Sequence, residues 1–170
     1  VIYKKFELSS EAIQILVANI GDMDRAYDFA ENIKDPKVYS NLAIAQLNRG
    51  MVKEAIRSFI KAGNHEYFAN VINIANEQGL FEDLIPYLDM CRAHLKHPMI
   101  ESELMFAYAK TDNLASLQEL ISSPNVGQIQ EVGDRCFQNQ LYRAAKLLFN
   151  SISNYPRLCS TLIKMEDWEG

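Results

Sequence analysis

Three glycines occur at equal intervals in the first half of this chain. Gly21, Gly50 and Gly79 are each 29 residues apart. A fixed period of roughly 20 to 50 residues is typical of a repeat array, in which one repeat cannot bury its apolar face without its neighbours. The spacing therefore predicts that the chain folds as stacked copies of one supersecondary unit.

Residues at fixed offsets from these glycines, which we call the anchors, are apolar in every repeat. The frame continues without glycine at Asp112, Gln140 and Glu166. The positions five and nine residues after an anchor are spaced i, i+4, and such residues share one face of a helix. The apolar residues are Ile13, Leu42, Val71, Leu104, Val132 and Leu158 eight positions before the anchors, Ala26, Ala55, Leu84, Leu117 and Ala145 five positions after them, and Ala30, Phe59, Leu88, Ile121 and Phe149 nine positions after them.

This spacing predicts helices throughout, since the alternation that is typical of strands is absent. Pro36 and Pro98 stand where the first residue of a helix is expected, and Ser9 or Ser10 can cap the first helix. We predict an all-α fold, an α-α superhelix in which helical hairpins stack as a solenoid, with residues 1–170 forming a single segment. The last hairpin is half complete, as expected for a fragment of a longer array. The predicted helices run near 10–19, 22–34, 36–48, 51–62, 65–77, 80–96, 98–110, 113–122, 127–138, 141–151 and 155–165.

Two residues inside predicted helices break the local rules. Pro86 lacks a backbone N–H, so we expect it to bend or interrupt its helix between Glu82 and Ile85. Gly133 has no glycine-rich motif around it that would make a phosphate-binding loop. We therefore expect Gly133 to mark a close approach of two helices.

The composition excludes some classes of function. The net charge of −5 argues against nucleic acid as a partner, which needs a basic surface. No apolar run approaches the roughly 18 residues that span a bilayer.

Cys91, Cys136 and Cys159 form no C-x-x-C motif, and Cys136 and Cys159 occupy core positions of the repeat. We expect buried or half-buried reduced thiols, which indicates a reducing compartment such as the cytosol.

No residue pattern points to catalysis, so we predict no enzyme activity and no cofactor. The best metal candidate is Cys91, His94 and His97, but a helix would turn its two outer members away from each other. We favour surface histidines near a helix end. The acidic pairs are explained as solvated charges in first helical turns, and they are Asp22 with Asp24, Glu82 with Asp83, and Glu101 with Glu103.

The strongest candidate for partner binding is a basic stripe. Lys53, Arg57 and Lys61 are spaced i, i+4 and i+8, which places them along one exposed face of a helix. Arg143 and Lys146 on a later helix could extend this strip. The stripe is a docking strip for an acidic partner helix, or an ordinary solvated face.

Four stretches in collinear order carry a family resemblance that covers nearly the whole chain. They resemble the clathrin heavy chain, and they are Ile20–Glu31, Ala45–Ala62, Glu103–Thr111 and Val132–Leu158. Tyr39, where the family usually has tryptophan, and Pro86 depart from its pattern. The resemblance implies an α-α zigzag that forms the proximal leg of the triskelion, a scaffold of the vesicle coat in endocytosis and intracellular transport. It also implies a cytoplasmic location on coated pits and vesicles, the clathrin light chain and other heavy-chain legs as partners, and membrane association only through adaptors.

Two other readings remain open. A helical-repeat subunit of a membrane-traffic tethering complex would share the same helical hairpins. A peptide-binding adaptor of the tetratricopeptide kind is disfavoured, because the spacing varies and the signature of that repeat is missing. An enzyme would require a cleft with convergent polar groups.

Overall fold

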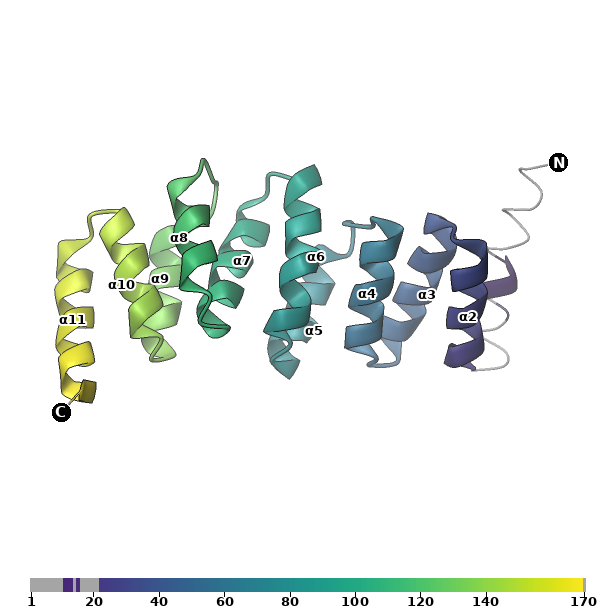
Figure 1. Ribbon diagram of the computed structural model, residues 1–170, viewed down its shortest axis with the longest axis horizontal. Helices are drawn as coiled ribbons and strands as arrows, with labels where there is room; N and C mark the ends of the chain where they lie inside the picture. Colours follow the sequence, from purple (N-terminus) through teal and green to yellow (C-terminus); the bar gives the residue numbers. More distant parts are fainter. Residues whose placement is uncertain (1–10, 14, 16–21, 170) are drawn as a thin grey trace. The chain divides into compact units, whose positions relative to one another are not determined.

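The computed structural model describes residues 11–13, 15 and 22–169, and every regular element in these ranges is an α-helix (Figure 1). This confirms the predicted all-α fold. None of the described helices is both long enough and apolar enough to cross a membrane. After the helical residues 11–13 and 15, the helices are α2 (Met23–Ile33), α3 (Pro36–Asn48), α4 (Val52–Ala62), α5 (Phe68–Gln78), α6 (Phe81–His94), α7 (Pro98–Lys110), α8 (Leu114–Ser122), α9 (Ile129–Gln138), α10 (Tyr142–Ser151) and α11 (Tyr155–Glu169).

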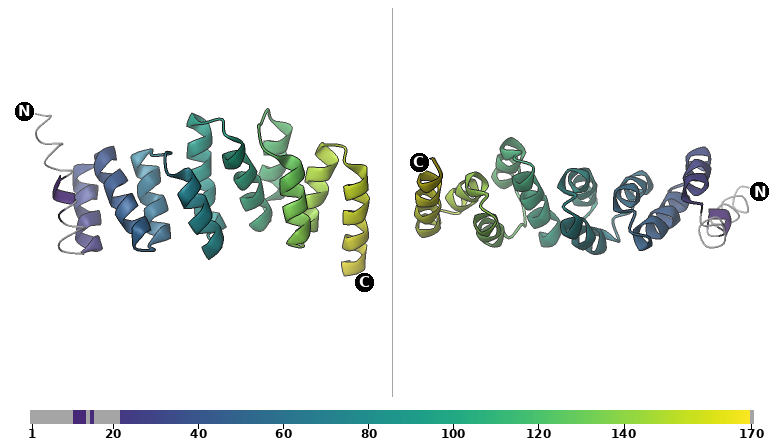
Figure 2. Two further views of the ribbon diagram at one scale, coloured as in Figure 1. Left: turned by 180° about the vertical axis from the view of Figure 1, so that it is seen from behind. Right: turned by 90° about the horizontal axis from the view of Figure 1, so that it is seen from below.

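The chain divides into two compact units, 1–90 and 91–170. In the first unit α3 packs between α2 and α4, and α4 also contacts α5. In the second unit α7 contacts α8 and α9, and α10 contacts α8, α9 and α11. Within each unit, most consecutive helices thus lie side by side (Figure 2), as expected for stacked helical hairpins. That residues 1–170 are one segment of a longer array stays a prediction.

Most of the residues that the repeat frame selects belong to the buried core. All five residues at five positions after an anchor are completely buried. The frame fails in two places. Ile121 is only half-buried, because α8 turns the preceding Leu120 into the core instead, and Leu158 is half-buried on α11. The offset from the anchor therefore predicts the buried face well, and its error at α8 is one residue.

The anchors within the described residues share one turn geometry. Gly50, Gly79, Asp112 and Gln140 have φ values of 76°, 69°, 51° and 62°, the left-handed region that ends many helices. Each anchor N–H donates to the carbonyl three residues back, and the next N–H donates to the carbonyl five residues before it, as in Gln140 to Phe137 and Leu141 to Cys136. This is the Schellman motif, which satisfies the last carbonyls of a helix. Gly21 lies outside the described residues.

The predicted helix starts are confirmed at two prolines. Asp35 precedes Pro36, and its Oδ1 accepts a hydrogen bond from Lys37 N at 2.9 Å. His97 precedes Pro98, and its Nδ1 accepts from Met99 N at 3.2 Å. Each cap satisfies an N–H group that has no partner inside the helix. The predicted cap at Ser9 or Ser10 lies outside the described residues.

Of the two outcomes expected at Pro86, the interruption is wrong, and the bend stays a prediction. The helix α6 is continuous from Phe81 to His94, with Pro86 exposed in its second turn. The missing N–H removes one intrahelical hydrogen bond. Leu84, Tyr87 and Leu88, which flank the proline, are completely buried. We attribute the continuity to this packing, which outweighs the lost hydrogen bond.

Two expectations on α11 are also wrong. Glu166, taken as the last anchor, lies inside the helix, because the residues around it are good helix formers without glycine. Cys159 is exposed, since Thr161 is the residue that α11 buries completely. By contrast, Cys91 and Cys136 are buried as expected.

The close helix approach expected at Gly133 is confirmed. A Cβ atom at this position would lie 2.7 Å from Cε1 of Phe149. Phe149 is completely buried on α10, so its ring packs directly on the backbone of α9. The glycine is explained by packing between two helices.

Candidate functional site

The predicted basic stripe lies on the solvent side of α4. Ala55, Ile56 and Phe59 bury the opposite face. The side chains of Lys53, Arg57 and Lys61 are 54%, 67% and 38% exposed. The prediction that these three cations share one exposed helix face is therefore correct. The residues that they contact could not be predicted from their spacing.

Two residues of the stripe flank one carboxylate of a neighbouring helix. Asp83, in the first turn of α6, lies 3.7 Å from Lys53 and 3.9 Å from Arg57. Both distances exceed that of a direct hydrogen bond, and both cations are largely exposed. Exposed pairs of this kind contribute little to stability, so both cations can turn to an external acidic group.

Lys61 has a different environment. Its ammonium group forms an ion pair with Glu31 of α2 and donates to the hydroxyl of Tyr27 at 2.9 Å. It also lies 5.0 Å and 5.4 Å from the ring centroids of Tyr27 and Tyr39. The hydrogen bonds from Lys61 and Tyr27 lower the pKa of Glu31, and those with Glu31 and Tyr27 raise the pKa of Lys61. Lys61 therefore ties α4 to α2.

The second predicted group, Arg143 and Lys146, lies on α10. Arg143 pairs with Asp112 at 3.3 Å, and both side chains are exposed. Lys146 forms no ion pair within the described part of the chain. Both residues line a hollow of about 310 Å³. Its other lining residues are Leu114, Ala115, Gln118, Leu147 and Met165. Apolar side chains with two cations at the rim suit an acidic amphipathic helix.

A buried ionic cluster in the second unit was missed by the sequence. Glu101 is 3% exposed, although it was expected to be a solvated first-turn charge. Its carboxylate accepts from Arg92 Nε at 3.1 Å and from the backbone N–H of Val126. Ser102 accepts from Gln128 N at 2.9 Å. These bonds attach the connection between α8 and α9 to α7, which the spacing of charges along the sequence could not reveal.

The three residues of the metal candidate do not converge. Cys91 is completely buried, His94 is exposed, and the Nδ1 atom of His97 caps α7. Among the residues that the structure describes, no group of three metal-ligating side chains is found. Burial raises the pKa of the Cys136 thiol to about 12, as expected of an unreactive thiol.

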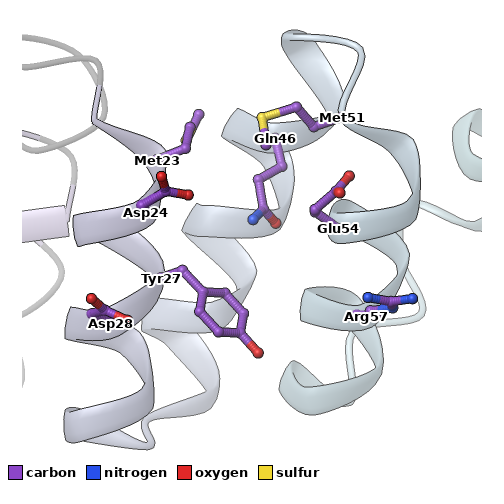
Figure 3. A pocket seen from close by; sticks show the side chains of 8 residues that line it. All are labelled: Met23, Asp24, Tyr27, Asp28, Gln46, Met51, Glu54 and Arg57. Carbon is purple, nitrogen blue, oxygen red and sulfur yellow. The ribbon is translucent and has the colours of Figure 1, made fainter.

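A second hollow, of about 470 Å³, lies between α2 and α4 with α3 behind it (Figure 3). Met23, Asp24, Tyr27 and Asp28 line it from α2. From the other side it is lined by Gln46 of α3, by Met51, which immediately precedes α4, and by Glu54 and Arg57 of α4. The predicted residue Arg57 thus belongs to the rim of a pocket that the sequence did not identify.

The comparisons with known proteins identify the family. Residues 59–170 match the family described as a region in clathrin and VPS. The chain belongs to the clathrin repeat family. The clathrin heavy chain of Dictyostelium discoideum is 50% identical over 98% of this chain, that of Drosophila melanogaster is 45% identical over 99%, and clathrin heavy chain 2 of Homo sapiens is 42% identical over 99%. The chain spans about 10% of the length of each of these relatives.

The family resemblance expected from the sequence is therefore confirmed. In this clathrin repeat the two predicted basic groups occur at a related position, since Lys53 and Arg143 each follow an anchor by three residues. They belong to different units. That they form one strip, and that they bind a partner, stay predictions. The signal that could have identified the α2 hollow is the run Met23, Asp24, Tyr27 and Asp28, which repeats apolar and acidic residues one helical turn apart.

Proposed function

We propose that this chain is a scaffold segment of a clathrin-type vesicle coat and not an enzyme. The observation that carries the proposal is the match of nearly the whole chain to clathrin heavy chains. As the resemblance implies, the segment lies in a proximal leg, in the cytoplasm at coated pits and vesicles, and meets membranes only through adaptors. It acts mechanically, by stacking helices and packing against other legs.

Within each unit, the fold supports this mechanical role through burial between neighbouring helices. Helices that bury their apolar faces on one another support their neighbours. Recognition in such an assembly is spread over exposed ridges, where many weak contacts add through multivalency. A lattice built in this way assembles firmly and can still come apart.

A chimera tests the scaffold proposal. The matching segment of the Dictyostelium discoideum heavy chain is replaced by this chain, and the purified chimera is assembled into cages and followed by sedimentation and electron microscopy. We expect cages to form. A control chimera with Ala145→Asp, which places a charge in the core, should not form them. A folded, trimeric chimera that forms no cages would contradict leg packing.

A tethering-complex subunit remains the second candidate, because the family description covers VPS proteins as well as clathrin. A segment of that kind would fold equally well in the chimera but would not support cage assembly. The same experiment therefore distinguishes the two candidates.

The finer part of the proposal is light-chain binding. The α10 pair supports it better than the α4 stripe, because Arg143 and Lys146 flank an apolar hollow, whereas Lys61 is engaged with Glu31. Titration calorimetry with the central helix of a clathrin light chain, at two salt concentrations, measures this binding. We expect Arg143→Glu with Lys146→Glu to weaken it about tenfold or more and to reduce its salt dependence, with Lys53→Glu as the comparison in the first unit. Unchanged affinity in the double variant would remove α10 from the binding surface.

A further inference from the structure

The hollow between α2 and α4 has the size of a binding site. Its volume of about 470 Å³ lies within the range of roughly 300 to 1,000 Å³ that is typical of ligand pockets. Figure 3 shows Asp24 and Glu54 on opposite sides of the opening, with the side chain of Gln46 ending between the two helices. Neither the repeat packing nor the basic stripe accounts for this hollow.

Two polar side chains of the hollow are held in place by hydrogen bonds to residues that do not line it. Tyr27 is fixed by the hydrogen bond from Lys61 to its hydroxyl at 2.9 Å. Gln46 is 2% exposed, and its Oε1 accepts from the hydroxyl of the buried Ser58 at 2.7 Å. A site that is fixed before binding loses less conformational freedom when a ligand enters.

The floor of the hollow combines adaptable apolar groups with one donor. Met23 and Met51 supply thioether side chains, which adapt to the shape of an apolar partner. Because the Oε1 atom of Gln46 accepts from Ser58, the amide nitrogen of Gln46 is available to donate into the hollow. No described residue accepts from this nitrogen. The buried amide therefore offers hydrogen bonds to a carbonyl oxygen of a ligand.

The rim carries an excess of negative charge. Asp24, Asp28 and Glu54 are exposed, and no described residue forms an ion pair with any of them. Arg57 is the cation among the lining residues, and it lies 3.9 Å from Asp83. Three carboxylates against one shared guanidinium group favour a ligand that brings positive charge to the rim.

We propose that this hollow binds a short segment of a partner protein in which a long apolar side chain, such as leucine, is flanked by lysine or arginine. The apolar side chain enters between Met23 and Met51, a backbone carbonyl of the segment accepts from Gln46, and the flanking cations meet Asp24 and Glu54. This interaction is independent of the coat proposal and of the basic pair on α10, and it shares only Arg57 of the lining with the basic stripe on α4.

Methyl-detected NMR of this chain, with its methionines labelled with carbon-13, tests the site directly. The probe is the peptide GKRLKRG, with GEDLEDG and GKRGKRG as comparisons. We expect saturable shifts of the Met23 and Met51 methyl signals with GKRLKRG and no shifts with the acidic peptide. The peptide without leucine should bind about tenfold more weakly, because it brings no apolar group. Equal binding of the leucine-free peptide would overturn the proposal.

Charge-reversal variants separate the site from general attraction to an acidic protein. Asp24→Lys and Glu54→Lys should each weaken binding of GKRLKRG about tenfold, while Glu77→Lys, an exposed acid on α5 that does not line the hollow, should change it less than about twofold. Circular dichroism checks that each variant is folded. If Glu77→Lys weakened binding as much as Glu54→Lys, or if the Met23 and Met51 signals did not move, the hollow would not be the site.

Discussion

The two units end their helices with the same turn but with different residues. In the first unit the left-handed position is occupied by Gly50, Gly63 and Gly79 and, at the end of α2, by Lys34. In the described part of the second unit it is occupied by Asp112, Gln140 and Ser153 and by no glycine. The backbone hydrogen bonds at the three glycine turns are the same as those at Asp112, Gln140 and Ser153. The turn is therefore set by how the hairpins pack. Glycine makes it easier to adopt, since other residues lose about 1 to 2 kcal/mol in this conformation.

The units also differ in where they place charge between helices. In the first unit the acid–base pairs of Lys53, Arg57 and Lys61 lie at the surface. The second unit also has an exposed pair, Arg143 with Asp112, but in addition it has the buried carboxylate of Glu101, which accepts from Arg92 and from the N–H of Val126. A surface pair is screened by water, whereas a buried carboxylate depends on every one of its partners. We expect the second unit to depend more on single polar residues.

The largest expected effect comes from Glu101→Ala. The substitution removes the carboxylate that accepts from Arg92 Nε and from the N–H of Val126, so we expect the free energy of unfolding to fall by about 3 kcal/mol. Urea denaturation measures the loss, and hydrogen exchange should speed up in the connection between α8 and α9. The matched variant in the first unit is Glu31→Ala, whose loss should be much smaller because its pair is exposed. If Glu31→Ala lost as much stability as Glu101→Ala, the proposed difference between the two units would be wrong.

Gly133→Ala tests the contact between α9 and α10. Ala43 and Phe59 of the first unit have the same offsets from their anchor as Gly133 and Phe149, so the substitution gives the second unit the residue of the first. The added methyl would lie 2.7 Å from Phe149, and we expect a net loss of about 1 to 2 kcal/mol in urea denaturation.

Two further variants check that Phe149 is the cause. The double variant Gly133→Ala with Phe149→Leu should lose less free energy of unfolding than the sum of the two single variants, because leucine is smaller than the phenylalanine ring that the added methyl meets. Gly127→Ala should lose less than Gly133→Ala, since its new methyl meets the flexible end of Met105. Additive losses in the double variant would mean that the ring does not set the need for glycine.

Exchanging the anchor residues tests the turns with a smaller effect. Gly79→Gln should lower the free energy of unfolding by about 1 kcal/mol, and Gln140→Gly should raise it by up to about 1 kcal/mol. A Cβ at Gly79 meets no atom within 4 Å, so only the backbone conformation is changed. Chemical denaturation of both variants gives the comparison, and a destabilised Gln140→Gly would show that the side chain of Gln140 matters more than its φ.

The smallest expected effect is the pH dependence of the Lys61 contact. The pKa of Glu31 is lowered in the folded protein, so its contribution is present above its ordinary pKa and is lost as the pH falls through the lowered value. The pKa of Lys61 is raised, so its contribution is lost only in strong alkali. We expect the stability difference between the protein and Glu31→Gln to be constant near neutral pH and to shrink in acid. A difference that grows in acid would contradict this pairing.

The sequence was sufficient for the fold because the apolar period recurs in every repeat, and one helical face can be read from residues such as Ala55 and Phe59. It failed at Pro86 because tertiary packing overrides a local rule there, since the buried neighbours of the proline hold the helix together. It failed at Glu166 for a local reason, because no residue near Glu166 ends α11.

The candidate site was predicted in part, for a similar reason. The spacing of Lys53, Arg57 and Lys61 determines a shared helix face. It does not reveal the partners that other helices bring, such as Asp83 and Glu31. The hollow between α2 and α4 has lining residues from three helices, and the spacing of Met23, Asp24, Tyr27 and Asp28 along α2 indicates only one side of it.

The attachment of the connection between α8 and α9 has a consequence for proteases. An irregular stretch such as 123–128 is ordinarily a preferred site of cleavage, because a protease must draw an extended strand into its active site. Here Glu101 and Ser102 hold the backbone N–H groups of Val126 and Gln128 against α7. A protease cuts this stretch only after both hydrogen bonds open, which makes it a durable connection despite its lack of regular structure.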